Sequence, residues 1–246
     1  MDTLFHHQLF DLSKQVTPYL SGSIAPASKG QISLSVNLSD AIGALYCDIS
    51  RSNEEAGKGY WMTRCWECVI WQPVYLAFIS IYALKGLPQL TTLSQKVQSS
   101  SVYGFHFPSH QHIHGEHEQL IKIAGKQLDQ LFSVYLQQMN NHVRIRPGYA
   151  NHLLADLILS CLVKLQQGLA LQQNHTVVQD QHSSSQNDYF QQQAQLWFEA
   201  LQLPTTLLRG LKSNNPDRLE LIRTSCCLVY RCEQGTLCDN CPRNHA

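Results

Sequence analysis

The sequence has little charge and no excess of either sign. Charged residues make up 15% of the 246-residue chain, against roughly 25% in an average globular protein, and 18 Lys and Arg balance 18 Asp and Glu. No long block of like charge interrupts this balance. Because nucleic-acid-binding proteins carry a basic excess or a basic stripe, we expect no nucleic-acid partner.

The sequence also lacks a secretory signal and an unbroken apolar run of membrane-spanning length. Asp2 stands where a signal peptide carries positive charge, and no run of small residues marks a cleavage site. The longest apolar stretch, 68–84, contains Gln72 and Pro73 and is shorter than the roughly 20 residues that a span needs. We therefore expect a buried helix there, no transmembrane span, and a cytoplasmic location in which thiols stay reduced.

A third absence concerns redox cofactors. The chain has no Gly-x-Gly-x-x-Gly dinucleotide fingerprint and no pattern that indicates a flavin site. Electrons for a redox step would therefore come from an external donor, such as a ferredoxin or a reductase.

Apolar periodicity predicts a mainly α fold with a small β-sheet (α+β). Helical spacing predicts helices over 3–20, 40–49, 61–84, 117–139, 151–171 and 190–203. Alternating apolar residues predict strands over 31–39, 101–107 and 142–146, of which 31–39 has the clearest pattern. Ser39 or Asp40 is expected to cap the second helix, and Pro73 to kink or break the third. Residues 166–196 are rich in Gln, Ser, Asn and His and are expected to be partly loop.

Against these absences, cysteine is concentrated in one place. Five of the nine cysteines lie near the C-terminus: Cys226, Cys227, Cys232, Cys238 and Cys241. Two pairs at a compatible distance can surround one metal centre. Adjacent cysteines form a poor zinc knuckle, because neighbouring side chains of an extended chain point to opposite faces. A two-iron cluster is wider, so the spacing favours iron–sulfur chemistry and leaves structural zinc open.

The tail resembles the C-terminal signature of the FhuF-type ferric-siderophore reductases, with Cys226-Cys227, a ten-residue spacer and Cys238-x-x-Cys241. The resemblance implies that these four cysteines hold a [2Fe-2S] cluster and that Cys232 is a spare thiol. It also implies a cytoplasmic protein, or one peripheral at the inner membrane face, with no transmembrane span. Residues 1–203 would form a mainly helical siderophore-binding domain, and 204–246 a cluster-binding segment packed on it.

The activity that the resemblance implies is one-electron reduction of siderophore-bound Fe(III) to Fe(II), which the chelator holds far less tightly. The substrate would be a ferric siderophore, and iron would be released in the cytoplasm. Two alternatives remain: an interaction module in which zinc bound by four tail cysteines stabilises the fold, and an iron–sulfur sensor or scaffold without enzymatic activity.

Several cationic and aromatic side chains are candidate contacts for the cluster or the substrate. Arg223, Arg231 and Arg243 lie near the cysteines in sequence and would offset thiolate charge or dock an acidic donor. Arg144 and Arg146 precede a turn and are candidate contacts for an anionic chelator. Trp61, Trp66 and Trp71 are expected to be mostly core residues, and one of them is a candidate to line a siderophore pocket. For all these arginines, ordinary surface charge is the competing interpretation.

A group of histidines and a pair of cysteines each have a purely structural interpretation and a functional one. The segment 105–118 holds five of the twelve histidines: His106, His110, His112, His114 and His117. It is either a polar loop or a metal site, and His110, His112 and His114 would share a face only on a strand. Cys65 and Cys68 are expected to be buried thiols packed against tryptophan rather than a second metal site.

Overall fold

A computed structural model of the chain describes residues 2–173, 186–215 and 218–244. The α-helices are α1 (Asp2–Val16), α2 (Leu38–Ser52), α3 (Gly57–Leu84), α4 (His117–Met139), α5 (Pro147–Gln173) and α6 (Gln186–Ala200). The strands are β1 (Gly22–Ile24), β2 (Gly86–Pro88), β3 (Ser94–Gln98), β4 (Ser101–Phe107), β5 (His112–His114), β6 (Leu211–Asn215) and β7 (Arg218–Leu221). Short 3-10 helices are η1 (Glu54–Ala56), η2 (Leu90–Thr92), η3 (Thr205–Gly210), η4 (Val229–Arg231) and η5 (Pro242–Asn244). The mainly α fold with small sheets is confirmed.

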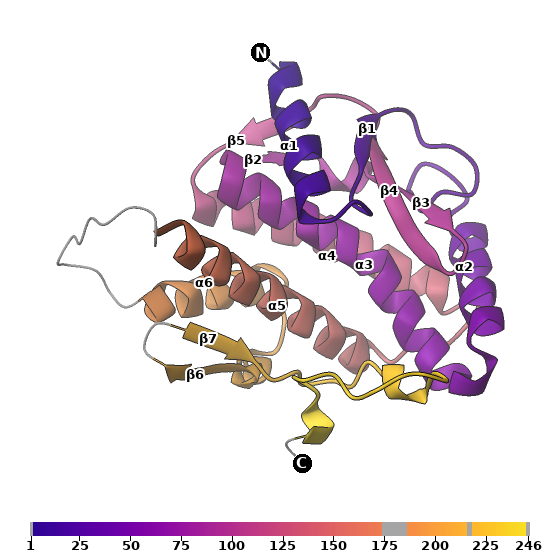
Figure 1. The fold of residues 1–246 in the computed structure, drawn as a ribbon. Helices are drawn as coiled ribbons and strands as arrows, with labels where there is room; N and C mark the ends of the chain where they lie inside the picture. Colours follow the sequence, from indigo (N-terminus) through magenta and orange to yellow (C-terminus); the bar gives the residue numbers. More distant parts are fainter. Residues whose placement is uncertain (1, 174–185, 216–217, 245–246) are drawn as a thin grey trace.

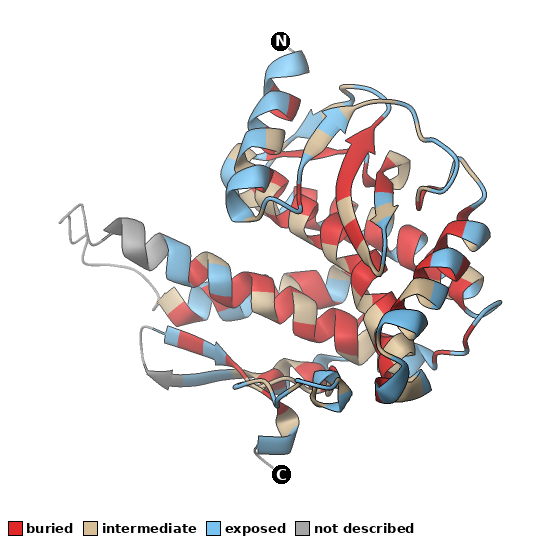
Figure 2. Cartoon of the chain, turned by 45° about the vertical axis from the view of Figure 1, so that its right-hand side comes forward, coloured by how far each residue is buried: buried red, intermediate tan, exposed pale blue. Residues whose placement is uncertain are grey.

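Helix α3 is the central element of the fold, in contact with α1, α2, α4 and α5 (Figure 1). The sheet β1-β4-β3 lies on the side of α3 where α2 begins, and β1 runs parallel to β4. Strands β2 and β5 pair at the end where α1 begins, and the hairpin β6-β7 lies along α5. From this hairpin the chain continues into the cysteine-rich tail, which passes the ends of α5 and α3. Figure 2 shows that α3 and α5 are largely buried between the other elements.

Pro73 neither breaks nor ends α3, so of the expected kink or break the break is wrong. Proline has no N–H to donate to the carbonyl four residues earlier, here that of Val69. The side-chain Nε2 of Gln95 donates to the Val69 carbonyl oxygen at 3.1 Å. Because Gln95 is completely buried, this bond satisfies a carbonyl that would otherwise be orphaned in the core.

Helix α3 is also longer than its apolar run suggests. Together with η1 it forms a segment, Glu54–Leu84, that is long and apolar enough to cross a membrane by length and composition alone. In the fold, 61% of the most apolar window of this segment is buried inside the protein. Such burial is typical of a core helix, as the expectation for 68–84 stated.

The clearest predicted strand, 31–39, is wrong. Its only ladder contact is an isolated bridge between Ile32 and Gln95. The Ser33 hydroxyl accepts from the backbone N–H of Ser35, a local bond that turns the chain away from an extended path. Helix α2 then begins earlier than expected, since Asn37 rather than Ser39 or Asp40 provides the cap.

One other segment prediction also needs correction. Residues 142–146 form no strand, although Val143 and Ile145 are buried. In the polar stretch 166–196, α5 continues to Gln173 and α6 begins at Gln186, so any loop expected there lies between the two helices. Gln166 and Asn187 are buried there because they bond to each other at 2.8 Å. Residues 174–185 of this stretch lie outside the described part of the chain.

Candidate functional site

The four signature cysteines form two sulfur pairs. Cys226 Sγ lies 3.9 Å from Cys241 Sγ, and Cys227 Sγ lies 3.3 Å from Cys238 Sγ. Thiolates that share a tetrahedral metal ion at about 2.3 Å lie about 3.8 Å apart. Within the described residues, no three His, Cys, Asp or Glu side chains surround a single ion position. The four thiols instead form two pairs, and four cysteine thiolates are the donor set that a cluster of two irons requires.

Cys232 belongs to neither pair. It is half-buried and packs against the core. Burial, together with the Cys232 thiol beside it, raises the pKa of the Tyr60 hydroxyl to about 12. This placement agrees with the interpretation of Cys232 as a spare thiol.

The backbone between the pairs is held in one tight conformation. Leu228 adopts a left-handed conformation with φ of 62°, which turns the chain out of Cys227 into η4. At Gly235, a side-chain Cβ would collide with the carbonyl oxygen of Val229. The Cys241 N–H donates to the Cys238 carbonyl at 2.9 Å and closes the Cys-x-x-Cys turn. These features bring the two ends of the spacer together.

Asp156 of α5 anchors the start of the tail with both carboxylate oxygens. One oxygen accepts from the backbone N–H and the hydroxyl of Thr224, at 2.7 and 3.0 Å. The other accepts from the backbone N–H and the hydroxyl of Ser225, at 3.0 and 2.5 Å. Asp156 is 2% exposed, so these bonds are shielded from water and fix the chain directly before Cys226.

Arg223 continues this anchor toward α3. Its guanidinium lies 2.8 Å from the Glu67 carboxylate and 3.5 Å from Asp156, and its side chain is 18% exposed. Burial lowers the pKa of Arg223, but the attraction of Glu67 and Asp156 outweighs burial and leaves the pKa raised. The backbone N–H of Arg223 also donates to the backbone carbonyl oxygen of Asn240 at 3.0 Å. Arg223 thus joins α3, α5 and both ends of the tail.

Tyr149 and Glu55 fix the tail at two more points. The Tyr149 hydroxyl donates to the Cys226 carbonyl at 3.0 Å and lies 2.9 Å from the Thr63 hydroxyl. Glu55 accepts from the backbone N–H of Glu233 within the spacer. Burial raises the pKa of the Cys227 thiol to about 11, so metal binding there releases a proton.

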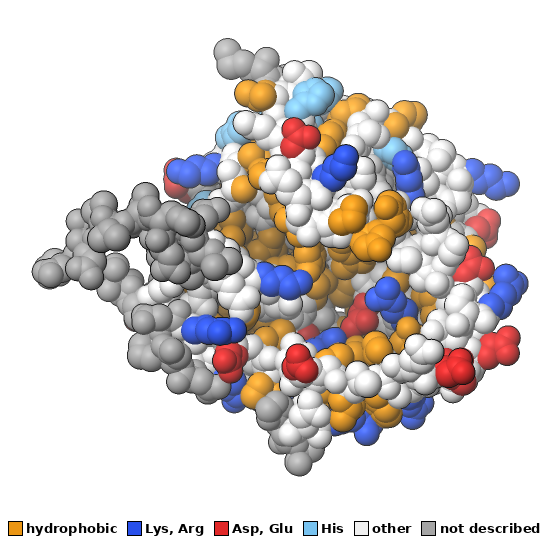
Figure 3. All heavy atoms as spheres, viewed as in Figure 1, with side chains coloured by type: hydrophobic (Ala, Val, Ile, Leu, Met, Phe, Trp, Pro, Cys, Tyr) orange, Lys and Arg blue, Asp and Glu red, His pale blue; other side chains and the backbone are white. Residues whose placement is uncertain are grey.

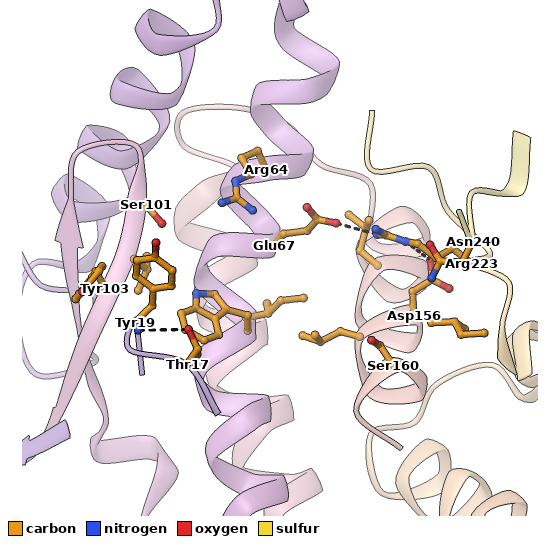
Figure 4. A pocket seen from close by; sticks show the side chains of 16 residues that line it. Thr17, Tyr19, Arg64, Glu67, Ser101, Tyr103, Asp156, Ser160, Arg223 and Asn240 are labelled. Carbon is orange, nitrogen blue, oxygen red and sulfur yellow. Dashed lines mark hydrogen bonds and ion pairs between the residues drawn. The ribbon is translucent and has the colours of Figure 1, made fainter. Parts of the chain in front are cut away.

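A cavity of about 660 Å³ opens beside the tail, between α3, α5 and β4. Figure 3 shows this hollow at the centre of the visible face, with apolar side chains on its walls. In Figure 4, Tyr19 and Tyr103 lie on one side, Arg64 and Glu67 project from α3, and Arg223 closes the far side. The tail contributes Arg223 and Asn240 to the lining, and Asn240 directly precedes Cys241. The cavity therefore takes part of its wall from the tail, although none of the cysteines is among its lining residues.

The structure separates the candidate contact residues. Arg223 lines the cavity, as does Trp71. Arg231 is exposed on η4, and Arg144 and Arg146 are exposed and are not among the residues that line this cavity. Any contact of these three arginines with a chelator stays a prediction. Arg243 lies over the Tyr230 ring at 4.8 Å.

Sequence reasoning missed Glu67, Asp156 and Asn240. Asp156 had a signal, since it interrupts the apolar run LLADLILSCL, where an acidic side chain must find partners. Cys65 and Cys68, by contrast, are buried thiols as expected, and burial raises the pKa of both.

Comparison with known proteins gives one family match and no structural one. Residues 223–243 match the family model described as the FhuF 2Fe-2S C-terminal domain. No solved structure matches the chain. The matched range contains all four paired cysteines, so the resemblance found in the sequence is confirmed, and the cofactor that it supports is a [2Fe-2S] cluster. Over residues 223–243, the chain is therefore similar to the iron–sulfur domain of the FhuF family.

Proposed function

We propose that the protein is a cytoplasmic ferric-siderophore reductase whose substrate binds in the 660 Å³ cavity beside the cysteine tail. The observation that supports this most is that Arg223 and Asn240, which belong to the tail, line the cavity. A chelated Fe(III) in the cavity would lie close to the thiol pairs. The reaction transfers one electron, so Fe(III) becomes Fe(II) and the chelator is left unchanged.

We assign Cys226, Cys227, Cys238 and Cys241 as the cluster ligands, with each sulfur pair serving one iron. When bound, the [2Fe-2S] cluster supplies single electrons, which suits a one-electron reduction. Arg223 places a buried positive charge beside Cys227, whose pKa it lowers against the larger effect of burial. The same charge stabilises the thiolate form that a cluster requires.

The cavity has the size and chemistry for a compact organic chelate. Its volume lies within the roughly 300–1,000 Å³ of small-molecule sites. Tyr19, Trp71 and Tyr103 provide aromatic surface, and Arg64 provides a donor for chelator oxygens. The pKa of Arg64 is raised, chiefly by the Cys68 thiol and against burial, so its positive charge is secure.

Transfer from the reduced protein tests the proposal. Anaerobically purified protein should contain about two irons and two sulfides per chain. After chemical reduction, it should reduce a stoichiometric amount of ferric siderophore, measured as Fe(II) trapped by a ferrous chelator. A colourless protein with one zinc, or a reduced cluster that keeps its electron, would contradict the proposal and favour the interaction module or the sensor.

A cavity-blocking variant separates the substrate site from the cluster. Ser160→Trp should fill the cavity and slow siderophore reduction at least about tenfold while leaving iron and sulfide content unchanged. The matched control is Gln130→Trp on the exposed face of α4, which should behave like the parent protein. Equal siderophore reduction by the two variants would place the substrate elsewhere.

A further inference from the structure

His112 and His114 stand side by side on strand β5, at the opposite end of the molecule from the cysteine tail (Figure 1). Antiparallel pairing sets His112 opposite Pro88 and His114 opposite Gly86 of β2. Residues two apart on a strand project to the same face. Their Nε2 atoms lie 3.1 Å from each other.

The hydrogen bonds of the two rings fix their tautomers. Nδ1 of His112 lies 2.9 Å from the carbonyl oxygen of His110, and Nδ1 of His114 lies 3.1 Å from that of Lys85. A carbonyl oxygen only accepts, so each Nδ1 carries the hydrogen. In the neutral rings both Nε2 atoms then present lone pairs to each other. A proton or a metal ion between the two nitrogens would relieve the repulsion of these lone pairs.

The same arrangement is typical of histidines that ligate a metal. Metal-binding imidazoles usually donate the other ring N–H to a carbonyl or carboxylate, which orients the ring. Two nitrogens that share a tetrahedral ion at 2.0–2.1 Å lie about 3.3 Å apart, close to the observed 3.1 Å. His112 is half-buried and His114 is exposed, so an ion can reach them from solvent.

Aromatic neighbours hold both rings in place. Phe5 of α1 stacks on His112 with ring centroids 4.3 Å apart and planes 4° from parallel. The same phenyl meets His114 edge-on at 5.8 Å. A side chain on Gly86 would collide with Phe5, so glycine there lets β2 approach the stack.

A third imidazole lies next to the pair with unmet bonding capacity. His6 is completely buried, and neither of its ring nitrogens has a hydrogen-bond partner among the described residues. Its ring centroid is 5.6 Å from that of His112 and 5.2 Å from that of His110. A buried polar group without a partner is costly, so an ion-binding role at this position would give His6 a function.

We propose that His112 and His114 form a binding site for a first-row divalent ion of the zinc or copper type. Imidazole nitrogens favour these metals over Mg²⁺ or Ca²⁺. Over the described parts of the chain, no preformed group of three ligands includes this pair. The site is therefore a two-histidine site whose other positions are open to water or an external ligand.

Zinc titration of the cluster-loaded protein tests the site, because the four paired tail thiols are then occupied. Calorimetry should show one Zn²⁺ bound per chain, with the iron content unchanged before and after. His112→Gln and His114→Gln should each weaken binding at least about tenfold. His142→Gln is the matched control, since this exposed histidine lies within hydrogen-bond distance of Ser39 and bonds no other histidine among the described residues. Zinc should also raise the melting temperature of the parent and control proteins only.

Binding of Cu²⁺, measured by electron paramagnetic resonance, tests the site without any variant. The oxidised [2Fe-2S] cluster has no electron paramagnetic resonance signal, so one equivalent of Cu²⁺ on the oxidised protein should show hyperfine splitting from at least two nitrogens. Absence of that splitting, or zinc affinity unchanged in both His112→Gln and His114→Gln, would mean that the two rings share a proton and not a metal, and would overturn the proposal.

Discussion

At the residue scale, the tail depends on which thiols face each other. The pairs are nested in sequence, since Cys226 and Cys241 enclose Cys227 and Cys238. Each pair therefore takes one cysteine from the adjacent doublet and one from the Cys-x-x-Cys. Neither motif alone provides two facing thiols.

Replacing single cysteines should separate ligands from the spare thiol. We expect Cys238→Ser to lose the cluster and the reductase activity, because it leaves Cys227 without its facing thiol. Cys232→Ser should retain both, since Cys232 belongs to neither pair. Iron and sulfide analysis of anaerobically purified variants checks this. Loss of the cluster in Cys232→Ser would show that the ligand assignment is wrong.

Asp156 should control how the tail is presented. In Asp156→Asn, one carboxylate oxygen becomes an NH₂ group that faces donors of Thr224 or Ser225. We expect a loss of about 2–3 kcal/mol in the free energy of unfolding, because charged hydrogen bonds are replaced by a donor clash. Denaturant unfolding measures this loss, and the reduction potential of the cluster should shift as well.

The matched control for this change is Asp129→Asn. Asp129 is exposed on α4, and an exposed substitution should change the free energy of unfolding by no more than about 0.5 kcal/mol. If both variants unfold alike and keep the same potential, the anchor role of Asp156 is refuted.

At the scale of elements, α3 keeps its helical path through Pro73 because another element supplies the missing donor. Gln95→Met should cost about 1–3 kcal/mol, since it orphans the buried Val69 carbonyl. In a Pro73→Ala background the new N–H can bond that carbonyl, so Gln95→Met should cost about 1 kcal/mol less. Four unfolding curves give the double-mutant cycle. Strict additivity would mean that Gln95 does not replace the missing bond.

The elements also show what sequence patterns can and cannot predict. The strand at 101–107 and the helix at 117–139 have the bounds that periodicity predicts, because Val102, Phe105 and Phe107 of the strand and one face of the helix are buried in the core. The pattern at 31–39 fails because the Ser33 hydroxyl bonds the backbone locally, which an alternation of apolar residues does not report. Periodicity records which side chains are buried and not which backbone groups pair.

In the candidate site, too, one part could be predicted from the sequence and another part could not. The cysteine spacing identified the tail, because metal ligation constrains residue type and distance along the chain. Glu67 and Asp156 could not be connected to Arg223 from the sequence. Glu67 precedes Arg223 by 156 residues, and Asp156 precedes it by 67 residues. Their role depends on α3 and α5 meeting at the tail, which only the tertiary structure shows.

At the scale of the whole molecule, the tail ties two core helices together. Arg223 bonds Glu67 of α3, and Tyr149 of α5 bonds the Cys226 carbonyl. A cluster that closes the tail should therefore stabilise the packing of α3 against α5. We expect loaded protein to melt at least about 4 °C above the cluster-free form, on a scale of about 2–4 °C per kcal/mol. Circular dichroism at 222 nm before and after cluster removal measures the difference.

The control for that comparison is a chain without the four ligands, in which all are replaced by serine. Its melting temperature should equal that of the cluster-free parent and should not respond to the reagents that remove the cluster. Equal melting of loaded and cluster-free parent protein would show that the cluster adds nothing to the α3–α5 contact.

The tail faces the cavity with Arg223 and Asn240, but Val229 and Leu237 of its spacer are 36% and 41% exposed and are not among the cavity-lining residues. An electron donor that docks on these outer side chains would not compete with a siderophore for space. Donor and substrate would then occupy the protein simultaneously, and turnover would proceed through a ternary complex. Initial-rate plots at several donor concentrations would intersect, whereas a single shared docking face would give the parallel lines of a ping-pong cycle.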